Sequence, residues 1–307
     1  MGSEASSTHI RHRETDMRIN RAIERLAEDQ PVFYTGAHSG HVLTREQGGV
    51  DVGTWADYVN VGMEHGAFDM AGLEAYLEGM VEAGPSPSGH RTPAVLVEAP
   101  VDGGSEEGVR HNAWQFRQIL ARGAHGVVLC QVETEEAVRA FVEACRYPIN
   151  RSGVGRGLGE GTRGVGSEST AAAVWGVERE DYIQKADPWP LNPNGELLLG
   201  VKIETTQALE RIDAILAVPG IGFAEIGAGD MSMSMGHLRV PNPHTAELAD
   251  AFEKLKSACR AHGIRPLSSA TLENVQEKID EGYRVIAGGN SEIAARGRAQ
   301  TGGQGAL

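Results

Sequence analysis

Three features are scarce in this chain of 307 residues: cysteine, positive charge and long apolar runs. The cysteines are Cys130, Cys145 and Cys259, an odd number at wide spacing, which argues against both a disulfide framework and a cysteine-built zinc site. We expect them to be buried or half-buried free thiols of a reducing cytoplasm. No apolar run approaches the roughly 18 residues that a membrane-spanning helix needs.

Basic residues are in deficit, with 28 Lys and Arg against 42 Asp and Glu, for a net charge of -14. Such a surface repels phosphate backbones and anionic lipid, so we expect neither a nucleic-acid nor a membrane partner. The start of the chain is polar and shows no apolar secretory segment, which favours a cytoplasmic protein. With 40% hydrophobic and 23% charged residues, the composition is that of a globular protein.

Short apolar runs alternate with amphipathic segments along the whole chain. Strands are predicted at 32–37, 58–64, 93–99, 126–132, 197–204, 222–228, 265–270 and 283–289. Apolar residues at three- and four-residue steps predict helices over 71–84, 112–123, 134–145, 206–218, 244–263 and 273–282. Eight such units predict an α/β fold that closes as a (β/α)8 TIM barrel. A doubly wound open sheet is the alternative, although no GxGxxG between a strand and a helix supports it.

The domain organisation that we expect is simple. Residues 1–30 form an N-terminal extension with a helix, and residues 31–307 form one barrel domain. Residues 148–168 are rich in glycine and read as a long loop, and the tail after Arg298 reads as loose.

Catalytic side chains of such barrels stand at the carboxyl ends of the strands. Glu204 and Asp230 end neighbouring predicted strands, so their carboxylates can converge. Two hard oxygen ligands suit Mg²⁺ or Mn²⁺ better than a closed zinc site. His65, at another strand end, is a candidate general base because its ordinary pKa is about 6.5. The alternatives are two solvated loop acids and a structural histidine.

Several segments resemble, in chain order, the HpcH/HpaI family of metal-dependent (class II) 2-oxo acid aldolases, in its macrophomate-synthase-like branch. The resemblance runs roughly from residue 32 to residue 302. It rests on GMEHGAFD at the second strand, RGVG in a loop, GVKIET at the fifth strand, IGAGDMSMSMG at the sixth strand and VIAGGNSEIAARGRAQTG at the C-terminal strand and helix.

The resemblance implies a role for each matching residue. Glu204 and Asp230 match the metal ligands, for Mg²⁺, Mn²⁺ or Co²⁺, and His65 matches the histidine that handles a proton, with Glu64 beside it. The metal would chelate a small 2-oxo acid substrate and stabilise the enolate that carbon–carbon cleavage forms. The family fold exchanges its last helix, here around 293–298, within a homo-oligomer, a hexamer or trimer of dimers. Further substrate-binding candidates are Arg163, Gly227, Ala228, Ser232 and His38, the last on an insertion after the first strand.

The chain also departs from the family pattern. Glu98 stands where members carry an arginine that grips the substrate, and Gly62 and Ala121 replace two acids. Lys202 replaces a glutamine and should face the same side as Glu204, two residues on. Losing the arginine removes a cation that neutralises an oxyanion. Lys202 can restore that charge, form a structural ion pair with Glu98 or, as a third alternative, act as a Schiff-base amine.

The sequence thus predicts a divalent-metal-dependent carbon–carbon lyase of the aldolase type, working through a metal-bound enolate. A decarboxylase or hydrolase that uses the same site is one alternative. A non-catalytic binding barrel is the other, because the arginine and the acids of the family pattern are missing.

Overall fold

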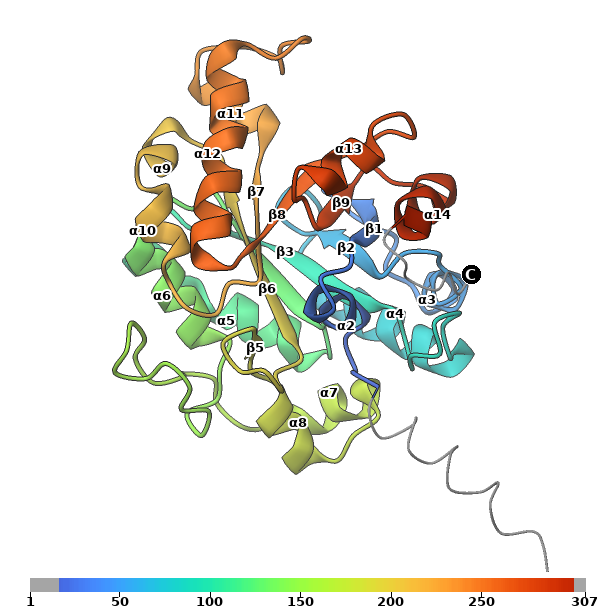
Figure 1. The fold of residues 1–307 in the computed structure, drawn as a ribbon. Coiled ribbons are helices and arrows are strands. Elements are labelled where there is room, and N and C mark those ends of the chain that lie inside the picture. Colours follow the sequence, from blue (N-terminus) through green and yellow to red (C-terminus); the bar gives the residue numbers. More distant parts are fainter. Residues whose placement is uncertain (1–16, 301–307) are drawn as a thin grey trace, which may run out of the picture.

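The computed structural model describes residues 17–300, and within them eight parallel strands form a barrel (Figure 1). The predicted polar segment at 1–15 and the end of the tail lie outside the described residues. All eight predicted strands are confirmed, with ends that differ by up to three residues. They are β1 (Val32–Ala37), β2 (Tyr58–Gly62), β3 (Ala94–Asp102), β4 (Gly126–Cys130), β6 (Leu197–Ile203), β7 (Phe223–Ile226), β8 (Arg265–Ser269) and β9 (Val285–Ala287).

The sheet closes on itself. β1 pairs with both β2 and β9, and β4 pairs with β6, so no strand of the eight is left at an edge. The short β5 (Pro188–Trp189) adds a third pairing to β6, which also pairs with β4 and β7. This closure confirms the (β/α)8 barrel and excludes the open doubly wound sheet.

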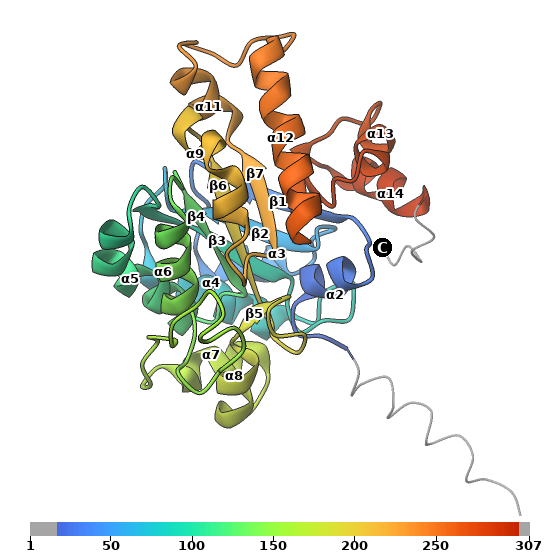
Figure 2. The same cartoon turned by 60° about the vertical axis from the view of Figure 1, so that its left-hand side comes forward.

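Helices surround the barrel (Figures 1 and 2). The six predicted helices are present, but the segment 206–218 breaks at Arg211 into two short helices. Four further helices, α3, α7, α8 and α11, were not predicted. The helices are α2 (Arg21–Ala27), α3 (Arg45–Asp51), α4 (Met70–Ala83), α5 (Glu106–Ala121), α6 (Glu135–Ala144), α7 (Glu168–Trp175), α8 (Arg179–Lys185), α9 (Thr206–Glu210), α10 (Ile212–Leu216), α11 (Ala228–Ser234), α12 (Ala246–His262), α13 (Val275–Asp280) and α14 (Ser291–Gln300).

Local sequence sets where the main helices begin and end. A side-chain oxygen accepts a hydrogen bond from the backbone N–H three residues on at Asp69, Ser105, Thr134 and Thr245, which begin α4, α5, α6 and α12. Gly263 ends α12 in the left-handed conformation, with φ of +69°, which a residue with a Cβ adopts less readily. The predicted loop at 148–168 is confirmed as far as residue 167, and α7 begins at residue 168.

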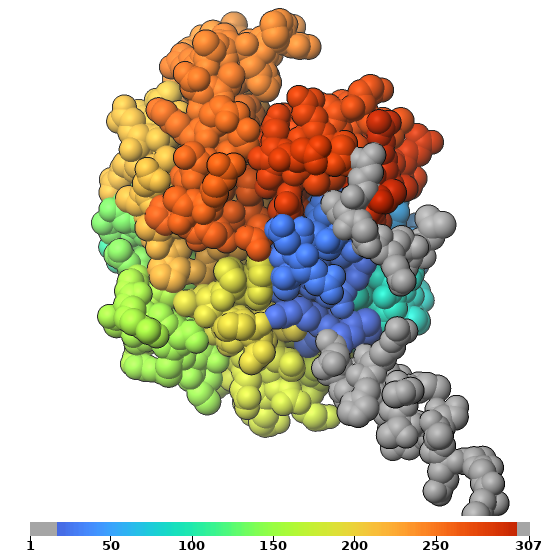
Figure 3. Space-filling view, viewed as in Figure 1, coloured from blue at the N-terminus to red at the C-terminus, as the bar shows by residue number. Residues whose placement is uncertain are grey.

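Two apolar layers hold the fold together. One lies between the strands and the outer helices. The other fills the barrel interior, where Tyr34 stacks on Tyr58, and it includes Ile23 and Leu26 of α2. The side-chain amide of Asn20 donates to the carbonyls of His125 and Glu196, just before β4 and β6. α2 therefore seals the amino-terminal end of the barrel, and Figure 3 shows the N-terminal segment filling the centre of that face.

The C-terminal helix packs on the barrel of its own chain. Gly297 of α14 lies against the ring of Phe33, so closely that a Cβ there would clash with it. Arg298 donates to the carbonyl of Trp55 at 3.1 Å and to Asp57 at 2.8 Å. Exchange of this helix between subunits, and the homo-oligomer itself, stay predictions. No helix within residues 17–300 is long and apolar enough to cross a membrane.

Candidate active site

The open end of the barrel carries a group of charged side chains that we name the mouth cluster. Most of them lie near or just after the carboxyl end of a strand, and Glu98 of β3 is level with Gly62 at the end of β2. Because all the strands run in the same direction, these ends share one rim. The mouth cluster comprises His38, Glu64, Glu98, Cys130, Lys202, Glu204 and Glu225.

Lys202 is the hub of the mouth cluster. Its Nζ lies 3.0 Å from Oε2 of Glu64 and 3.1 Å from Oε1 of Glu98, and all three side chains are buried. Burial by itself disfavours the charged form of Lys202, but Cys130 and the surrounding carboxylates, Glu225 first among them, outweigh it and raise its pKa. The predicted pairing of Lys202 with Glu98 is confirmed.

A second contact joins Glu98 to the insertion after β1. Nδ1 of His38 lies 2.6 Å from Oε1 of Glu98. This hydrogen bond raises the pKa of His38. Burial works to raise the pKa of Glu98, but the hydrogen bond from His38 and the charge of Lys202 outweigh it and lower that pKa. The structure therefore brings three predicted site residues, His38, Glu98 and Lys202, into one network of contacts.

Glu204 lies deep at the mouth, just after β6. Its Oε2 accepts a hydrogen bond of 2.7 Å from the backbone N–H of Gln131. Gly227 packs directly against the carboxylate, because a Cβ at this position would clash with Oε1 of Glu204. One ligand atom from each of Glu64, Cys130 and Glu204 lies within 4.8 Å of the other two. This is the group within residues 17–300 whose atoms are spaced to share a metal ion.

Acidic side chains outnumber basic side chains at the mouth. Burial raises the pKa of Glu204 to about 8, against the hydrogen bond from Gln131. Burial also raises the pKa of Glu225 to about 7, although the charge of Lys202 opposes this. Burial keeps the thiol of Cys130 neutral by raising its pKa well above the ordinary value. Both shifted carboxyls thus lack enough positive charge nearby to be fully ionised at neutral pH.

This donor set fits a divalent cation. Carboxylate oxygens are the ligands that Mg²⁺ and Mn²⁺ prefer, whereas a neutral thiol is a poor ligand for either. A doubly charged ion beside Glu204 and Glu64 would favour their ionised forms and offset the excess negative charge. The tight seat of Glu204 against Gly227 holds one of these oxygens in place without any side chain between them.

Two predicted residues stand at the edge of this group. Asp230 is partly buried in the first turn of α11, and it is not part of the three-donor group found in the described chain. Its pairing with Glu204 on a metal stays a prediction. His65 has 54% of its side chain exposed, and its Nε2 lies 3.6 Å from Oε2 of Glu64.

Other predicted substrate contacts lie elsewhere or are engaged locally. Arg163 is buried between the rings of Tyr147 and Tyr182, with its carbon Cζ 4.5 Å and 5.2 Å from the ring centres, and it donates to the hydroxyl of Tyr182 at 2.6 Å. These contacts are not with the mouth cluster. The hydroxyl of Ser232 donates to the carbonyl of Ala228 at 2.6 Å, inside α11.

Sequence reasoning missed Glu225 and Cys130. Both face the barrel interior, Glu225 level with Lys202 in the register of β6 and β7. An acid in the otherwise apolar run GFAEIGA was the available signal for Glu225. Nothing in the sequence marked Cys130, because an apolar-strand cysteine is ordinarily a packing residue. All three cysteines are buried and free, as predicted.

Two departures from the family pattern have different settings. A Cβ on Gly62 would clash with the carbonyl of His38, so the segment after β1 occupies the space that a side chain would need. Ala121 ends α5 and is buried. The path of the inserted segment therefore requires a glycine at position 62.

Comparison with known proteins decides the family. The family model described as HpcH/HpaI aldolase/citrate lyase matches residues 101–296, which is more than half of the chain. The chain belongs to this family. This confirms the resemblance seen in the sequence.

Curated members of the family that are similar to the chain are named as aldolases. The hydroxypyruvate/pyruvate aldolase of Roseovarius nubinhibens is 32% identical over 166 residues, which cover 53% of this chain and 58% of that protein. The 2-keto-3-deoxy-L-rhamnonate aldolase of Klebsiella pneumoniae is 37% identical over 167 residues, covering 54% and 56%. The chain thus spans just over half the length of these relatives.

Solved structures of the family share the fold. A HpcH/HpaI aldolase/citrate lyase family protein from Burkholderia cenocepacia superposes with a TM-score of 0.68 at 21% identity, covering 92% of this chain and 97% of that one. Macrophomate synthase superposes with a TM-score of 0.57 at 22% identity, covering 92% and 87%. At these identities the likeness concerns the barrel alone.

Proposed function

We propose that the protein is a divalent-metal-dependent carbon–carbon lyase of the aldolase type. Its substrate would be a 2-oxo acid or a related hydroxy-carbonyl compound. Membership of the family and the aldolase names of its relatives support this function. The observation that carries the proposal is the buried Glu204, seated against Gly227 and grouped with the carboxylate of Glu64 at the barrel mouth.

Glu204 and Asp230 are the residues that would hold the ion, with Glu64 beside them. Mg²⁺ or Mn²⁺ suits these oxygens. When bound, such an ion supplies a Lewis acid that stabilises the negative charge developing on the substrate carbonyl oxygen during cleavage. Burial of Glu204 strengthens this electrostatic role, since the surroundings are less polar than water.

Lys202 would act as a fixed cation rather than as a nucleophile. It stays protonated between Glu64 and Glu98, and an amine must lose its proton before it can form a Schiff base. Its role is therefore to hold the carboxylates of Glu64 and Glu98 in place and to lower the pKa of Glu98. Two imidazoles at the mouth, His38 and His65, are available to exchange a proton with the substrate.

The charge of the mouth bears on the substrate class. Once a bound divalent ion has ionised Glu204 and Glu225, the four glutamate charges at the mouth would exceed the combined charge of Lys202 and the ion, so a substrate with several negative charges would be repelled. We infer a substrate that carries one carboxylate, which the metal would neutralise, with an uncharged remainder.

Calorimetric titration with Mn²⁺ tests the proposal. We expect Glu204→Gln to weaken Mn²⁺ binding by on the order of 100-fold or more, since it removes a charged ligand. The matched control is Glu180→Gln, the same change at an exposed position of α8, and it should leave the affinity unchanged. Cleavage of a 4-hydroxy-2-oxo acid, followed by release of the 2-oxo acid, should need the metal and fall with Glu204→Gln.

Tight Mn²⁺ binding that survives Glu204→Gln would show that the ligands are assigned wrongly. Tight, Glu204-dependent binding without cleavage of any 2-oxo acid aldol would keep the metal site and overturn the lyase.

A further inference from the structure

The contact between His38 and Glu98 has the form of a catalytic pair. Nδ1 of His38 lies 2.6 Å from the carboxylate, and Glu98 is only 2% exposed, whereas 48% of the His38 side chain is exposed. An ionised carboxylate only accepts hydrogen bonds, so Nδ1 carries the hydrogen and the neutral ring keeps its lone pair on Nε2. The Nδ1 side of the ring is thus held by Glu98, and Nε2 remains to accept a proton.

The carboxylate is itself held firmly. The oxygen that binds His38, Oε1 of Glu98, also lies 3.1 Å from Nζ of Lys202. The other oxygen, Oε2, is buried and accepts no hydrogen bond from the described part of the chain. His38 and Lys202 are therefore the groups that compensate this buried charge, and the ring orientation of His38 is tied to it.

His65 lacks such an anchor. Its nearest carboxylate oxygen, Oε2 of Glu64, is 3.6 Å away, beyond the length of a hydrogen bond. The same oxygen is 3.0 Å from Lys202, its closer partner. Of the two imidazoles at the mouth, His38 is the one with a defined tautomer and orientation.

The backbone of this chain is shaped to admit His38. The carbonyl of His38 lies where a Cβ on Gly62 would stand, so any larger residue at position 62 would displace the segment. Gly62 is level with Glu98 in the register of β2 and β3. The glycine and the glutamate thus provide, on neighbouring strands, the space and the partner that His38 needs.

The pair also connects to the candidate metal donors. From Glu98 the contacts run through Lys202 to Glu64, at 3.1 Å and 3.0 Å, and Glu64 lies within 4.8 Å of Glu204. His38 therefore belongs to the same network of contacts as the candidate metal donors at the mouth.

From this geometry we propose that His38 is the general acid and base of the reaction and that Glu98 is its positioning residue. The inference rests on the proposed lyase function and extends it. It gives His38 the role for which His65 was the candidate from the sequence.

The step balances without a further reagent. Nε2 of His38 takes the proton from the hydroxyl on carbon 4 of a 4-hydroxy-2-oxo acid. The bond between carbons 3 and 4 breaks, carbon 4 becomes the aldehyde, and the electron pair of the broken bond forms the enolate of the 2-oxo acid. The proton on His38 then passes to carbon 3, and the neutral imidazole is restored.

Four variants of the full chain, assayed with saturating Mn²⁺, test the assignment. We expect His38→Ala to lower kcat by about 10²–10⁴-fold while KM changes little, and added imidazole to restore part of the rate. Glu98→Gln should lower kcat less and leave Mn²⁺ affinity unchanged. His65→Ala should lower kcat less than His38→Ala does. The matched control is His41→Gln, because His41 lies on the same insertion and is also paired with a carboxylate, Asp51 at 2.8 Å.

A readout without turnover tests the pair itself. In the ¹⁵N spectrum of histidine-labelled protein, His38 should show a protonated Nδ1 and an unprotonated Nε2, and Glu98→Gln should abolish the preference. His41→Gln should leave those signals in place.

The outcomes separate the two proposals. Full kcat in His38→Ala, with kcat lost in His65→Ala, would transfer the role to His65 and overturn the inference while leaving the lyase standing. An equal mixture of tautomers for His38 would overturn the positioning role of Glu98. A wild-type protein that binds Mn²⁺ but cleaves no aldol overturns both the lyase and the role given to His38.

Discussion

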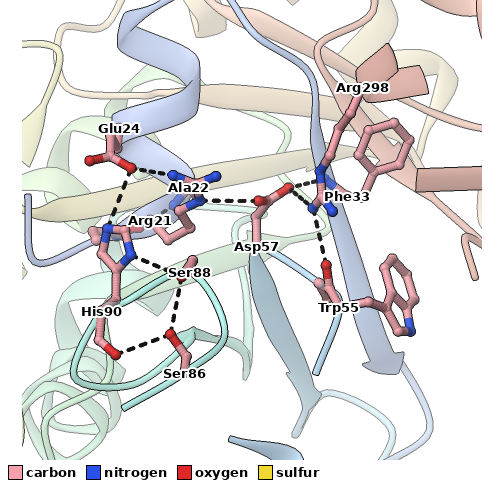
Figure 4. Close-up of polar contacts among 12 residues, drawn as sticks. Arg21, Ala22, Glu24, Phe33, Trp55, Asp57, Ser86, Ser88, His90 and Arg298 are labelled. Atoms are coloured by element: carbon pink, nitrogen blue, oxygen red, sulfur yellow. Dashed lines mark hydrogen bonds and ion pairs between the residues drawn. The ribbon is translucent and has the colours of Figure 1, made fainter. Parts of the chain in front are cut away.

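The two ends of the barrel differ in how far their buried carboxylates are compensated by positive charge. At the amino-terminal end, Asp57 accepts from the backbone N–H of Phe33 at 2.9 Å and from Arg298 at 2.8 Å, and it lies 3.4 Å from Nε of Arg21 (Figure 4). At the mouth, one lysine faces four glutamates, two of which have strongly raised pKa values. At the amino-terminal end, the polar groups hold helices and strands together. At the mouth, the carboxylates outnumber the cations, and a bound metal ion would compensate them.

The closed end also joins segments that are far apart in the chain. The loop before β3 contributes His90, whose Nδ1 is 2.9 Å from the hydroxyl of Ser88 and whose Nε2 is 3.4 Å from Glu24 of α2 (Figure 4). Together with the contacts of Asp57, these fasten α2, β2, the loop before β3 and α14 to one another. This end therefore contributes to stability and not to chemistry.

The largest effect on stability is expected at Asp57. Asp57→Asn removes the charge that two arginines share, and breaking a buried ion pair in this way costs about 3–5 kcal/mol. Urea unfolding should show that loss in the free energy of unfolding. The Mn²⁺ affinity of the folded protein should stay as in the wild type, because the change lies at the other end of the barrel. A loss below about 1 kcal/mol would contradict the role given to Asp57.

A smaller effect, dependent on pH, is expected at Glu225 in the mouth. Burial raises its pKa to about 7, so the folded state keeps a proton that the unfolded chain releases near 4.5. Between these values the folded protein binds more protons, and its free energy of unfolding falls as pH rises, by up to about 1.4 kcal/mol per pH unit. Glu225→Gln should flatten this slope when unfolding is measured at pH 5, 6 and 7 without divalent metal.

The control for Glu225 is again Glu180→Gln, whose carboxylate is exposed and should leave the slope unaltered. If the free energy of unfolding fell equally with pH in wild type and Glu225→Gln, Glu225 would have an ordinary pKa. The mouth would then hold more compensating positive charge than its geometry indicates.

The smallest effect is expected at Asp29, at the same end as Asp57. Asp29 accepts two hydrogen bonds of 3.1 Å from Arg284, but 65% of its side chain is exposed. Asp29→Asn is the same chemical change as Asp57→Asn and should alter the free energy of unfolding by less than about 1 kcal/mol. If the two variants lost equal stability, burial would not be what separates them.

The sequence predicted the barrel well because a parallel barrel repeats one pattern eight times. Each apolar run followed by an amphipathic segment is a local signal, and the closure follows from their number. The break at Arg211 was not predicted, since apolar periodicity continues across it while the hydrogen bonds of the helix do not. The four short helices were not predicted for a different reason: they contain too few turns to show a helical period.

The candidate site was predictable where residues lie on one strand. Lys202 lies on β6 and Glu204 just after it, two residues on, so their common side follows from strand geometry. The burial of Arg163 between two tyrosines was not predictable, because the glycine-rich loop that carries it has no period. Glu225 and Cys130 became site residues only through the register of neighbouring strands, which the sequence of one strand does not contain.

Because α2 closes the amino-terminal end of the barrel and apolar side chains fill its interior, the mouth is the end left for a substrate to enter. A lyase of the kind proposed above makes two products from one substrate, and both would leave through the mouth. The 2-oxo acid would lie deeper, against Glu204, so the aldehyde would leave first. The covered end of the barrel would thus set the order of product release.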